Sequence, residues 1–433
     1  MAMEEGLNVR SLRSVPAWTW VAVLALLLAM VPGASAQQAT VRGNAGYQLA
    51  YGYESGEIAE SVLNIELSLE QRLGFDGKLH IGFDGLVPLN GGDARFDVGE
   101  AYVDWYFDTT DWRVGRQVIN WGTADGFNPT SVINPRGALS PAALAKGELE
   151  GEPVLAVQGS YYLPSGGSLT GVAVAEFVPA AGADDMLAAI AAGVSAGLGG
   201  LPVDVERPAP VPSDGSQIEW AVRGDWLVGN HNVYVSYFRG WDDYPAAWLE
   251  YTPGMPPVAK IATQYRRVHE FGLATAGTIG GAGFWTELSY AVPEKLAVLD
   301  GPGAISSNEG YVEAVVGADY TFRNGVMVSG QVIYNGGGSL LMPYKEPGAA
   351  AQPQTYLLGI ARYSPEVGHN LEGILLANAT DGGIIAAGRY TYEMTQAVKL
   401  TAGLSHVMAD AGAEFAALKS AANLVTAGVE VSF

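Results

Sequence analysis

Hydrophobic and polar residues alternate with a period of two along almost the whole chain after residue 38. Between residues 63 and 70, leucine and isoleucine alternate with asparagine, serine and glutamate. The same alternation returns near 79–84, 218–226 and 312–320. Successive side chains of a strand point to opposite faces, so the pattern predicts strands with one apolar and one polar face. A soluble sandwich also alternates, but it rarely sustains strands of about ten residues over a whole chain.

The connections between these strands alternate between short and long, with one exception at 379–383. Transmembrane barrels have this asymmetry, with short turns on one side of the membrane and long loops on the other. The sequence therefore predicts an all-β fold, a transmembrane antiparallel up-and-down β-barrel of about 18 strands, with about 16 as the alternative count. The long connections are expected at 86–94, 121–151, 179–216, 242–263, 292–308, 337–354 and 409–421.

The last residues of the chain form a strand of the same kind that ends on an aromatic residue. Val425, Ala427, Val429, Val431 and Phe433 fall on one face, and polar or small residues fall on the other. This strand resembles the closing strand of bacterial outer-membrane β-barrels. The resemblance implies that the chain is located in the bacterial cell outer membrane, surrounded by its lipid. It also implies that the C-terminal strand contacts the barrel-assembly machinery.

Residues 1–36 are predicted to be a signal peptide, which leaves 37–433 as the barrel. Arg10 and Arg13 precede a wholly apolar run from Val21 to Val31, and the segment ends in the small residues 34–36. The alternative is an uncleaved membrane helix, since the apolar stretch is nearly long enough to span a bilayer.

Composition narrows the function. The 433 residues contain no cysteine, which excludes disulfides and thiolate metal sites. The formal net charge of -22 argues against a nucleic-acid partner and favours cations or neutral solutes such as sugars. The 57 glycines, 21 tyrosines and 10 tryptophans suit tight turns and aromatic girdles. The five histidines lie in no recognisable nucleophile–base pattern, so we expect neither an enzyme nor a metal or other cofactor.

The most distinctive segment runs from Gly115-Arg116-Gln117 through Trp121-Gly122 to Asn128-Pro129 and Asn134-Pro135. It resembles porin-like outer-membrane barrel families with a Gly-Arg-Gln strand, a Trp-Gly pair and repeated Asn-Pro in the following loop. The resemblance covers about 20 residues and implies a solute channel. Each Asn-Pro unit disfavours helix and fixes a turn. The 121–151 loop is therefore expected to fold into the lumen and narrow it, with an ordinary surface loop as the alternative.

The expected lumen lining combines this loop with the polar faces of the strands. Strict alternation places Arg116 beside lipid-facing residues, where a charge costs about 2–4 kcal/mol, so we expect a bulge at Gly115 that turns Arg116 inward. An excess of inward acids predicts mild cation preference, whereas pairing with bases on neighbouring strands would cancel it. The candidate pore-lining or constriction residues are Arg116, Trp121, Asp125, Asn128, Asn134, Glu66, Glu100, Asp104, Glu219, Arg223, Glu313 and Asp319.

Two further segments of long connections carry weaker expectations. Asp184-Asp185 followed by an apolar run predicts a short helix that ends at Gly199-Gly200. It would lie in the barrel mouth, cover a neighbouring loop or be disordered. Aromatic and acidic residues mix at Trp241–Tyr244 and Trp248–Tyr251, which suits sugar stacking or cation binding as well as girdle or loop packing.

Together these features predict an outer-membrane porin that passes small hydrophilic solutes by diffusion through a polar, net acidic lumen. One alternative is a substrate-selective channel for an oligosaccharide or polysaccharide. Another is a structural barrel occluded by its loops. The sequence leaves the oligomeric state open.

Overall fold

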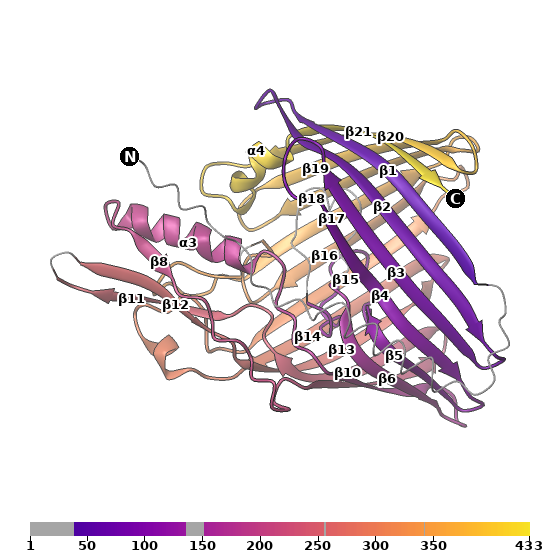
Figure 1. The fold of residues 1–433 in the computed structure, drawn as a ribbon, viewed down its shortest axis with the longest axis horizontal. Helices are drawn as coiled ribbons and strands as arrows, with labels where there is room; N and C mark the ends of the chain where they lie inside the picture. Colours follow the sequence, from indigo (N-terminus) through magenta and orange to yellow (C-terminus); the bar gives the residue numbers. More distant parts are fainter. Residues whose placement is uncertain (1–38, 136–150, 255–256, 342) are drawn as a thin grey trace.

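The computed structural model describes residues 39–135, 151–254, 257–341 and 343–433. Across these residues, 18 strands form one closed antiparallel β-barrel, drawn in Figure 1 with β1–β4 in front and β13–β16 behind. The predicted fold class and the predicted strand count are confirmed. The predicted signal peptide at 1–36 lies outside the described residues. The barrel strands are β1 (Thr40–Gly52), β2 (Glu57–Leu73), β3 (Gly77–Pro88), β4 (Arg95–Tyr106), β5 (Thr110–Gln117), β6 (Val154–Tyr162), β7 (Ser168–Val174), β9 (Glu219–Val228), β10 (His231–Trp241), β13 (Arg267–Ile279), β14 (Ala282–Pro293), β15 (Tyr311–Thr321), β16 (Met327–Asn335), β17 (Gln354–Tyr363), β18 (His369–Asn378), β19 (Ile384–Glu393), β20 (Val398–Met408) and β21 (Leu424–Ser432).

The barrel closes where its first strand meets its last. β21 pairs antiparallel with β20 on one side and with β1 on the other. The terminal Phe433 extends this seam, because its backbone N–H and C=O both bond to Gly43 at 2.9 Å. No sheet edge is left in the barrel, so its strand backbones are hydrogen-bonded on both sides.

The alternation seen in the sequence sets which side chains face inward. In β7, Leu169 is 47% exposed on the outer surface, whereas Thr170, Val172 and Val174 are buried on the inner one. In β9, Trp220 and Val222 face outward and Ala221 is buried inside. Period-two patterning therefore produces an apolar outer surface and an inner surface available to the lumen.

Short turns lie at one end of the barrel and long connections at the other. The short end carries Gly229-Asn230 and Gly280-Gly281, where all the glycines have positive φ as tight hairpins require. At the long-loop end, the shortest connections are 53–56, 379–383 and 89–94, so the connection expected to be long at 86–94 is short. Among the longer loops at that end, some contain short helices, namely η1 (Ala297–Asp300), η2 (Glu414–Leu418) and α4 (Lys419–Ala422).

A separate layer is built beyond the barrel rim at the long-loop end, on the left of Figure 1. It contains α3 (Ala183–Gly197) and a small sheet of β8 (Val203–Val205), β11 (Ala246–Thr252) and β12 (Val258–Gln264). The predicted helix is confirmed: it ends at Gly197, and Gly199 and Gly200, both with positive φ, follow it. The buried side of α3 packs on this outer sheet, where Leu187 and Ile261 belong to one buried cluster. The helix therefore covers neighbouring loops. We call α3 together with this sheet the outer cap.

No helix in the described ranges has the length and apolar character needed to cross a membrane.

Candidate channel constriction

The connection after β5 folds into the barrel instead of over its rim. Ile119, Trp121 and Ile133 are buried against inward-facing wall residues such as Val172 of β7 and Ala221 of β9. Further along, Phe127 is buried against Trp285 of β14 and Ile333 of β16, among other wall residues. Apolar contact with several inner strands places residues 118–135 inside the lumen. We call this segment the inserted loop. It is the described part of the predicted 121–151 constriction loop, and 136–150 lie outside the described residues.

A buried carboxylate on the wall holds the middle of the inserted loop. Glu287 of β14 is 1% exposed, and its two oxygens accept hydrogen bonds from Thr123, Ala124 and Thr130. Thr130 alone donates twice, from its backbone N–H at 3.0 Å and its hydroxyl at 2.8 Å. A buried carboxylate is costly unless it is fully hydrogen-bonded, and these donors satisfy Glu287. The loop and this side chain therefore depend on each other.

The far end of the inserted loop reaches β16. The Ser329 hydroxyl donates to the Asp125 carboxylate at 3.0 Å, and the Gln331 amide donates to the Asp125 carbonyl. Asn128 folds the tip back, because its side-chain oxygen accepts from the Ala124 N–H at 2.9 Å. The inserted loop thus crosses the inner wall from β5 to β16 and returns.

The base of the inserted loop is clamped beside β5. Asn134 is 5% exposed and accepts from the Ile119 N–H at 2.7 Å. Its amide donates to the carbonyls of Gln117 and Glu152 at 3.0 and 2.8 Å. Glu100 of β4 accepts from the Val118 N–H at 2.8 Å where the loop leaves the strand. Asn134 and Glu100 are therefore predicted site residues that position the loop.

Trp121 is fixed by Arg223 of β9. The guanidinium lies 5.2 Å from the centre of the Trp121 ring and 5.0 Å from that of Tyr234. It also donates to the Trp121 carbonyl at 3.4 Å. Trp121 is only 3% exposed, so its ring packs the loop against the wall and does not line open lumen.

The wall formed by β2, β3 and β4 carries a row of opposed acids. Glu66 of β2 stands directly opposite Asp84 of β3, and Asp84 stands opposite Asp97 of β4. All three residues are exposed. Like charges directly opposite each other across strands are destabilising. We call Glu66, Asp84 and Asp97 the acidic row.

Other predicted acids have specific partners. Asp104 of β4 is ion-paired with Arg113 of β5 at 2.7 Å. Glu219 of β9 is 4% exposed and accepts from the Trp241 N–H at 2.7 Å. Cross-strand ion pairs of the kind weighed in the sequence also join Lys78 to Glu70 at 2.9 Å and Lys399 to Glu430 at 3.3 Å. Pairing therefore offsets part of the acidic excess, and the acidic row is the clearest exception.

Two predicted residues have contrasting positions on the wall. Asp319 lies on the inward register of β15, opposite Gly283 and Ser329. Strand pairing does not support an inward Arg116. This residue lies opposite Ala101 and Leu155, and the pairing of β5 has no register shift at Gly115. The shift lies between β3 and β4, where the Gly99 carbonyl accepts from the Arg116 Nε at 3.2 Å. Gly115 has φ 140° instead, and an added Cβ would lie 2.2 Å from the Ala101 carbonyl. The predicted bulge at Gly115 is therefore wrong, and an inward Arg116 stays a prediction.

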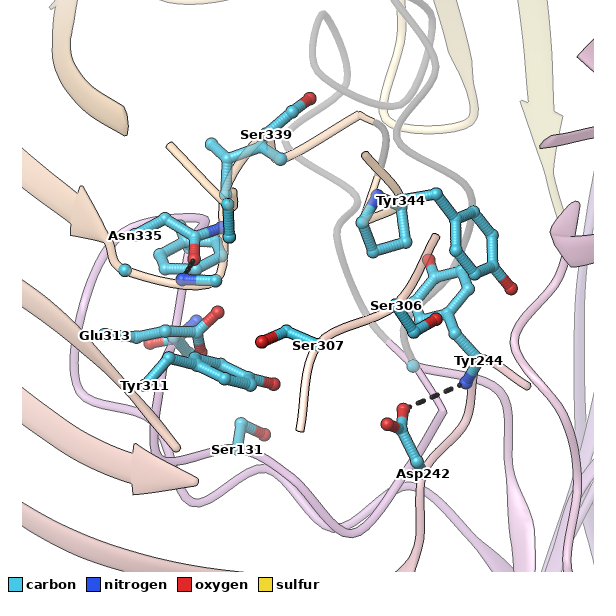
Figure 2. Close-up of a pocket in the computed structure, with 18 of the residues that line it drawn as sticks. Ser131, Asp242, Tyr244, Ser306, Ser307, Tyr311, Glu313, Asn335, Ser339 and Tyr344 are labelled. Carbon is cyan, nitrogen blue, oxygen red and sulfur yellow. Dashed lines mark hydrogen bonds between the residues drawn. The ribbon is translucent and has the colours of Figure 1, made fainter. Parts of the chain in front are cut away.

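A cavity of about 450 Å³ lies between the inserted loop and the long connections. Glu313 and Tyr311 of β15 line one side, and Asp242, Tyr244 and Tyr344 line the other (Figure 2). Glu313, a predicted site residue, is 3% exposed. Asp125, Asn128 and Asn134 also line the cavity, so it brings four of the predicted residues together.

The aromatic and acidic cluster near 241–251 is engaged in local packing. Arg267 stacks on Trp241 with 4.1 Å between the guanidinium carbon and the ring centre. The Trp248 indole donates to Glu250 at 3.0 Å, and Glu250 is also 3.2 Å from Lys260. These two contacts hold the pKa of the Glu250 carboxyl below its ordinary value. This arrangement follows the packing alternative weighed in the sequence.

Several contacts of the inserted loop and of the barrel around it had no clear sequence signal. Glu287 is recognisable from alternation as an inward acid, but its anchoring role depends on a loop more than 150 residues earlier in the chain. Gln117 is fully buried and donates to the Ala156 carbonyl at 2.9 Å. Glu414 accepts from Tyr356 at 2.6 Å and from Asn378 at 2.8 Å. These contacts join residues that are distant in sequence, which local patterns do not reveal.

No family model and no curated protein matches the sequence. Among solved structures, a mutant of Rh. blastica porin is 12% identical with a TM-score of 0.41, over 92% of this chain and 100% of that one. Salmonella typhi OmpF in complex with daunomycin is 10% identical with a TM-score of 0.45, over 91% of this chain and 97% of that one. Neither likeness is close enough to say what this chain does.

Proposed function

We propose that this protein is a porin of the bacterial outer membrane. Small hydrophilic solutes would diffuse through its lumen, past the inserted loop. The observation that carries the proposal is the loop itself, which is fixed inside a closed barrel by Glu287 and Asn134 instead of covering the rim. A loop fastened to the wall narrows an aqueous channel to a set size. The 115–135 segment would then be the constriction that its resemblance to porin-like families implies.

The inner surface supports passage of polar solutes. The wall of β17–β21 and β1–β5 carries charged and amide side chains, among them Arg389, Glu372 and Asn44. The wall of β6–β9 is largely apolar where the inserted loop covers it. The polar surface therefore marks the side along which solutes would pass, and membrane lipid would surround the apolar exterior.

The charge of this passage favours cations. The acidic row keeps three carboxylates side by side at some cost in sheet stability. Carboxylates that face a water-filled passage raise the local concentration of cations. We therefore propose a mild preference for cations and neutral solutes over anions.

Planar-bilayer recording tests the proposal. Purified protein should insert and give stable ohmic conductance in KCl. Under a KCl gradient, the sign of the reversal potential should show that K⁺ is more permeant than Cl⁻. Absence of conductance from correctly folded protein would refute the porin proposal. A reversal potential of the opposite sign would refute the cation preference alone.

A further inference from the structure

Two arginines lie on the outer face of the barrel at its long-loop end. Arg239 is near the end of β10, and Arg267 opens β13. Arg239 pairs with His269, and Arg267 pairs with Trp241, in the same register that places the exposed Phe271 on the outer surface. Alternate residues of a strand share a face, so both arginines belong to the exterior. We call Arg239, Arg267 and His269 the basic rim patch.

The basic rim patch lies directly beyond an aromatic row on the same outer face. Trp220, Tyr237 and Phe271 form this row across β9, β10 and β13, with 5.1 Å between the ring centres of each neighbouring pair. Toward the short-turn end, the next outward residues are Val235 and Leu273, both exposed. Aromatic rings mark the boundary between the hydrocarbon of a membrane and its headgroups. The patch is therefore at headgroup level on the long-loop side of the barrel.

The protein holds the two guanidinium groups differently. Arg267 stacks on Trp241, and its N–H groups donate to the carbonyls of Ser216 and Ile218, the latter at 3.3 Å. In the part of the chain that the structure describes, Arg239 forms no ion pair and no side-chain hydrogen bond. One arginine is therefore fixed in position, and the other is available to a binding partner.

The basic rim patch is positive, although the whole chain has a formal net charge of -22. Glu294 borders the patch and accepts from the backbone N–H of Arg267 at 3.2 Å, but none of the described ion pairs joins it to either guanidinium. Two like charges at diagonal positions of one sheet face repel each other. An anion that contacts both arginines would remove this repulsion. Guanidinium groups bind phosphate oxygens especially well, because their paired donors match the phosphate geometry.

We propose that the basic rim patch binds the phosphate headgroup of a lipid in the membrane leaflet on the long-loop side. Arg239 and Arg267 would hold the phosphate, and the aromatic row would contact the start of the acyl chains. The apolar surface beside the patch favours a lipid over free phosphate, because acyl chains would cover that surface at the same time. The inference rests on the membrane location within the proposed function and is independent of conduction.

Native mass spectrometry of the purified protein in detergent tests the proposal, with phosphatidic acid as the probe. Phosphatidic acid should bind more tightly than the diacylglycerol with the same acyl chains, which lacks only the phosphate. Equimolar inorganic phosphate should not displace it. Equal binding of the two lipids would overturn the inference, and displacement by inorganic phosphate would overturn the assignment to a lipid. Absence of conductance with phosphatidic acid binding intact would refute the porin proposal alone.

Variants locate the site. Arg239→Gln should weaken phosphatidic acid binding about tenfold, the scale of one lost hydrogen bond to a charged group. Its KCl conductance should equal that of the parent, because the side chain is on the outer face. Arg323→Gln removes an exposed arginine between β15 and β16 at the short-turn end, and it should leave phosphatidic acid binding unchanged. Heat-dependent mobility on gels shows which variants have folded barrels. If folded Arg239→Gln binds phosphatidic acid like the parent, the basic rim patch is not the site.

Discussion

The carboxylate of Glu287 accepts two hydrogen bonds from Thr130, one from its backbone and one from its hydroxyl, across 157 residues of sequence. Both residues are buried, so neither partner can be replaced by water without rearrangement. This contact joins the barrel wall to the loop that narrows it.

Replacement of Glu287 by alanine should free the inserted loop. The backbone N–H groups of Thr123 and Thr130 would lose their acceptor, at about 1–3 kcal/mol for every group left buried, and the Ala124 N–H would keep only the Asn128 oxygen. We expect the loop to leave the wall part of the time, which raises the mean single-channel conductance and the current noise. Planar-bilayer recording measures both quantities.

Thr286→Val is a matched control for this variant. It changes the neighbouring residue of the same strand, whose side chain lies in the outward register. Its conductance should equal that of the parent protein. If folded Glu287→Ala has the single-channel conductance and the current noise of the parent, the Glu287 contact does not hold the loop.

The sequence predicts the barrel well because each strand carries its own evidence. Leu169 and Thr170 show the two faces of a strand without reference to any other part of the chain. The position of β21 in the seam follows from the same alternation. Strand count and loop asymmetry are sums of such local patterns, and both are confirmed.

The site is less predictable because it depends on pairs that are far apart in sequence. Trp121 looks like a lumen residue, yet Arg223 and the apolar wall bury it. The β11–β12 hairpin within the 242–263 connection was not expected, since its residues pack on α3 and β8 and not on the barrel. Local patterns cannot show which distant surface a loop will cover.

Asn134→Ala should destabilise the protein through the base of the inserted loop. The side chain makes three hydrogen bonds, to Ile119, Gln117 and Glu152. At about 1 kcal/mol each, with an added cost for a buried N–H left unpaired, the loss is about 2–4 kcal/mol. Urea unfolding in detergent micelles measures it. Asn128→Ala loses contacts within the loop tip only and should cost less, so equal losses would argue against a special role for the base.

The acidic row should account for much of the proposed cation preference. A variant with Glu66→Gln, Asp84→Asn and Asp97→Asn removes three exposed carboxylates from adjacent strands. We expect its reversal potential in a KCl gradient to move toward zero, because fewer fixed charges concentrate K⁺ in the lumen. The shift should be largest at low salt, where screening is weak.

A charge-matched control removes three exposed acids from the long-loop end. It combines Asp204→Asn, Asp214→Asn and Glu346→Gln. Its reversal potential should change less than that of the acidic-row variant. Equal changes would mean that overall charge, and not the position of the carboxylates, sets the preference.

The outer cap should loosen in alkali through Tyr265, which precedes β13 outside the barrel. Burial, with the nearby Asp184 and Asp243, raises the pKa of this phenol to about 12 from an ordinary value of 10.0. Its ring also packs edge to face on Phe177, with 4.9 Å between ring centres. Because the folded-state pKa is the higher one, the stabilisation is complete below the ordinary value and is lost as pH rises through the folded one. We expect the free energy of unfolding of the outer cap to fall by about 1–2 kcal/mol after discounting for solvent screening.

Protease cleavage of the 242–266 connection should accelerate across this pH range. Tyr265→Phe should reduce the acceleration, whereas Tyr251→Phe, at an exposed position of β11 in the outer cap, should leave it unchanged. An identical pH profile for Tyr265→Phe and the parent would exclude Tyr265 as the titrating group.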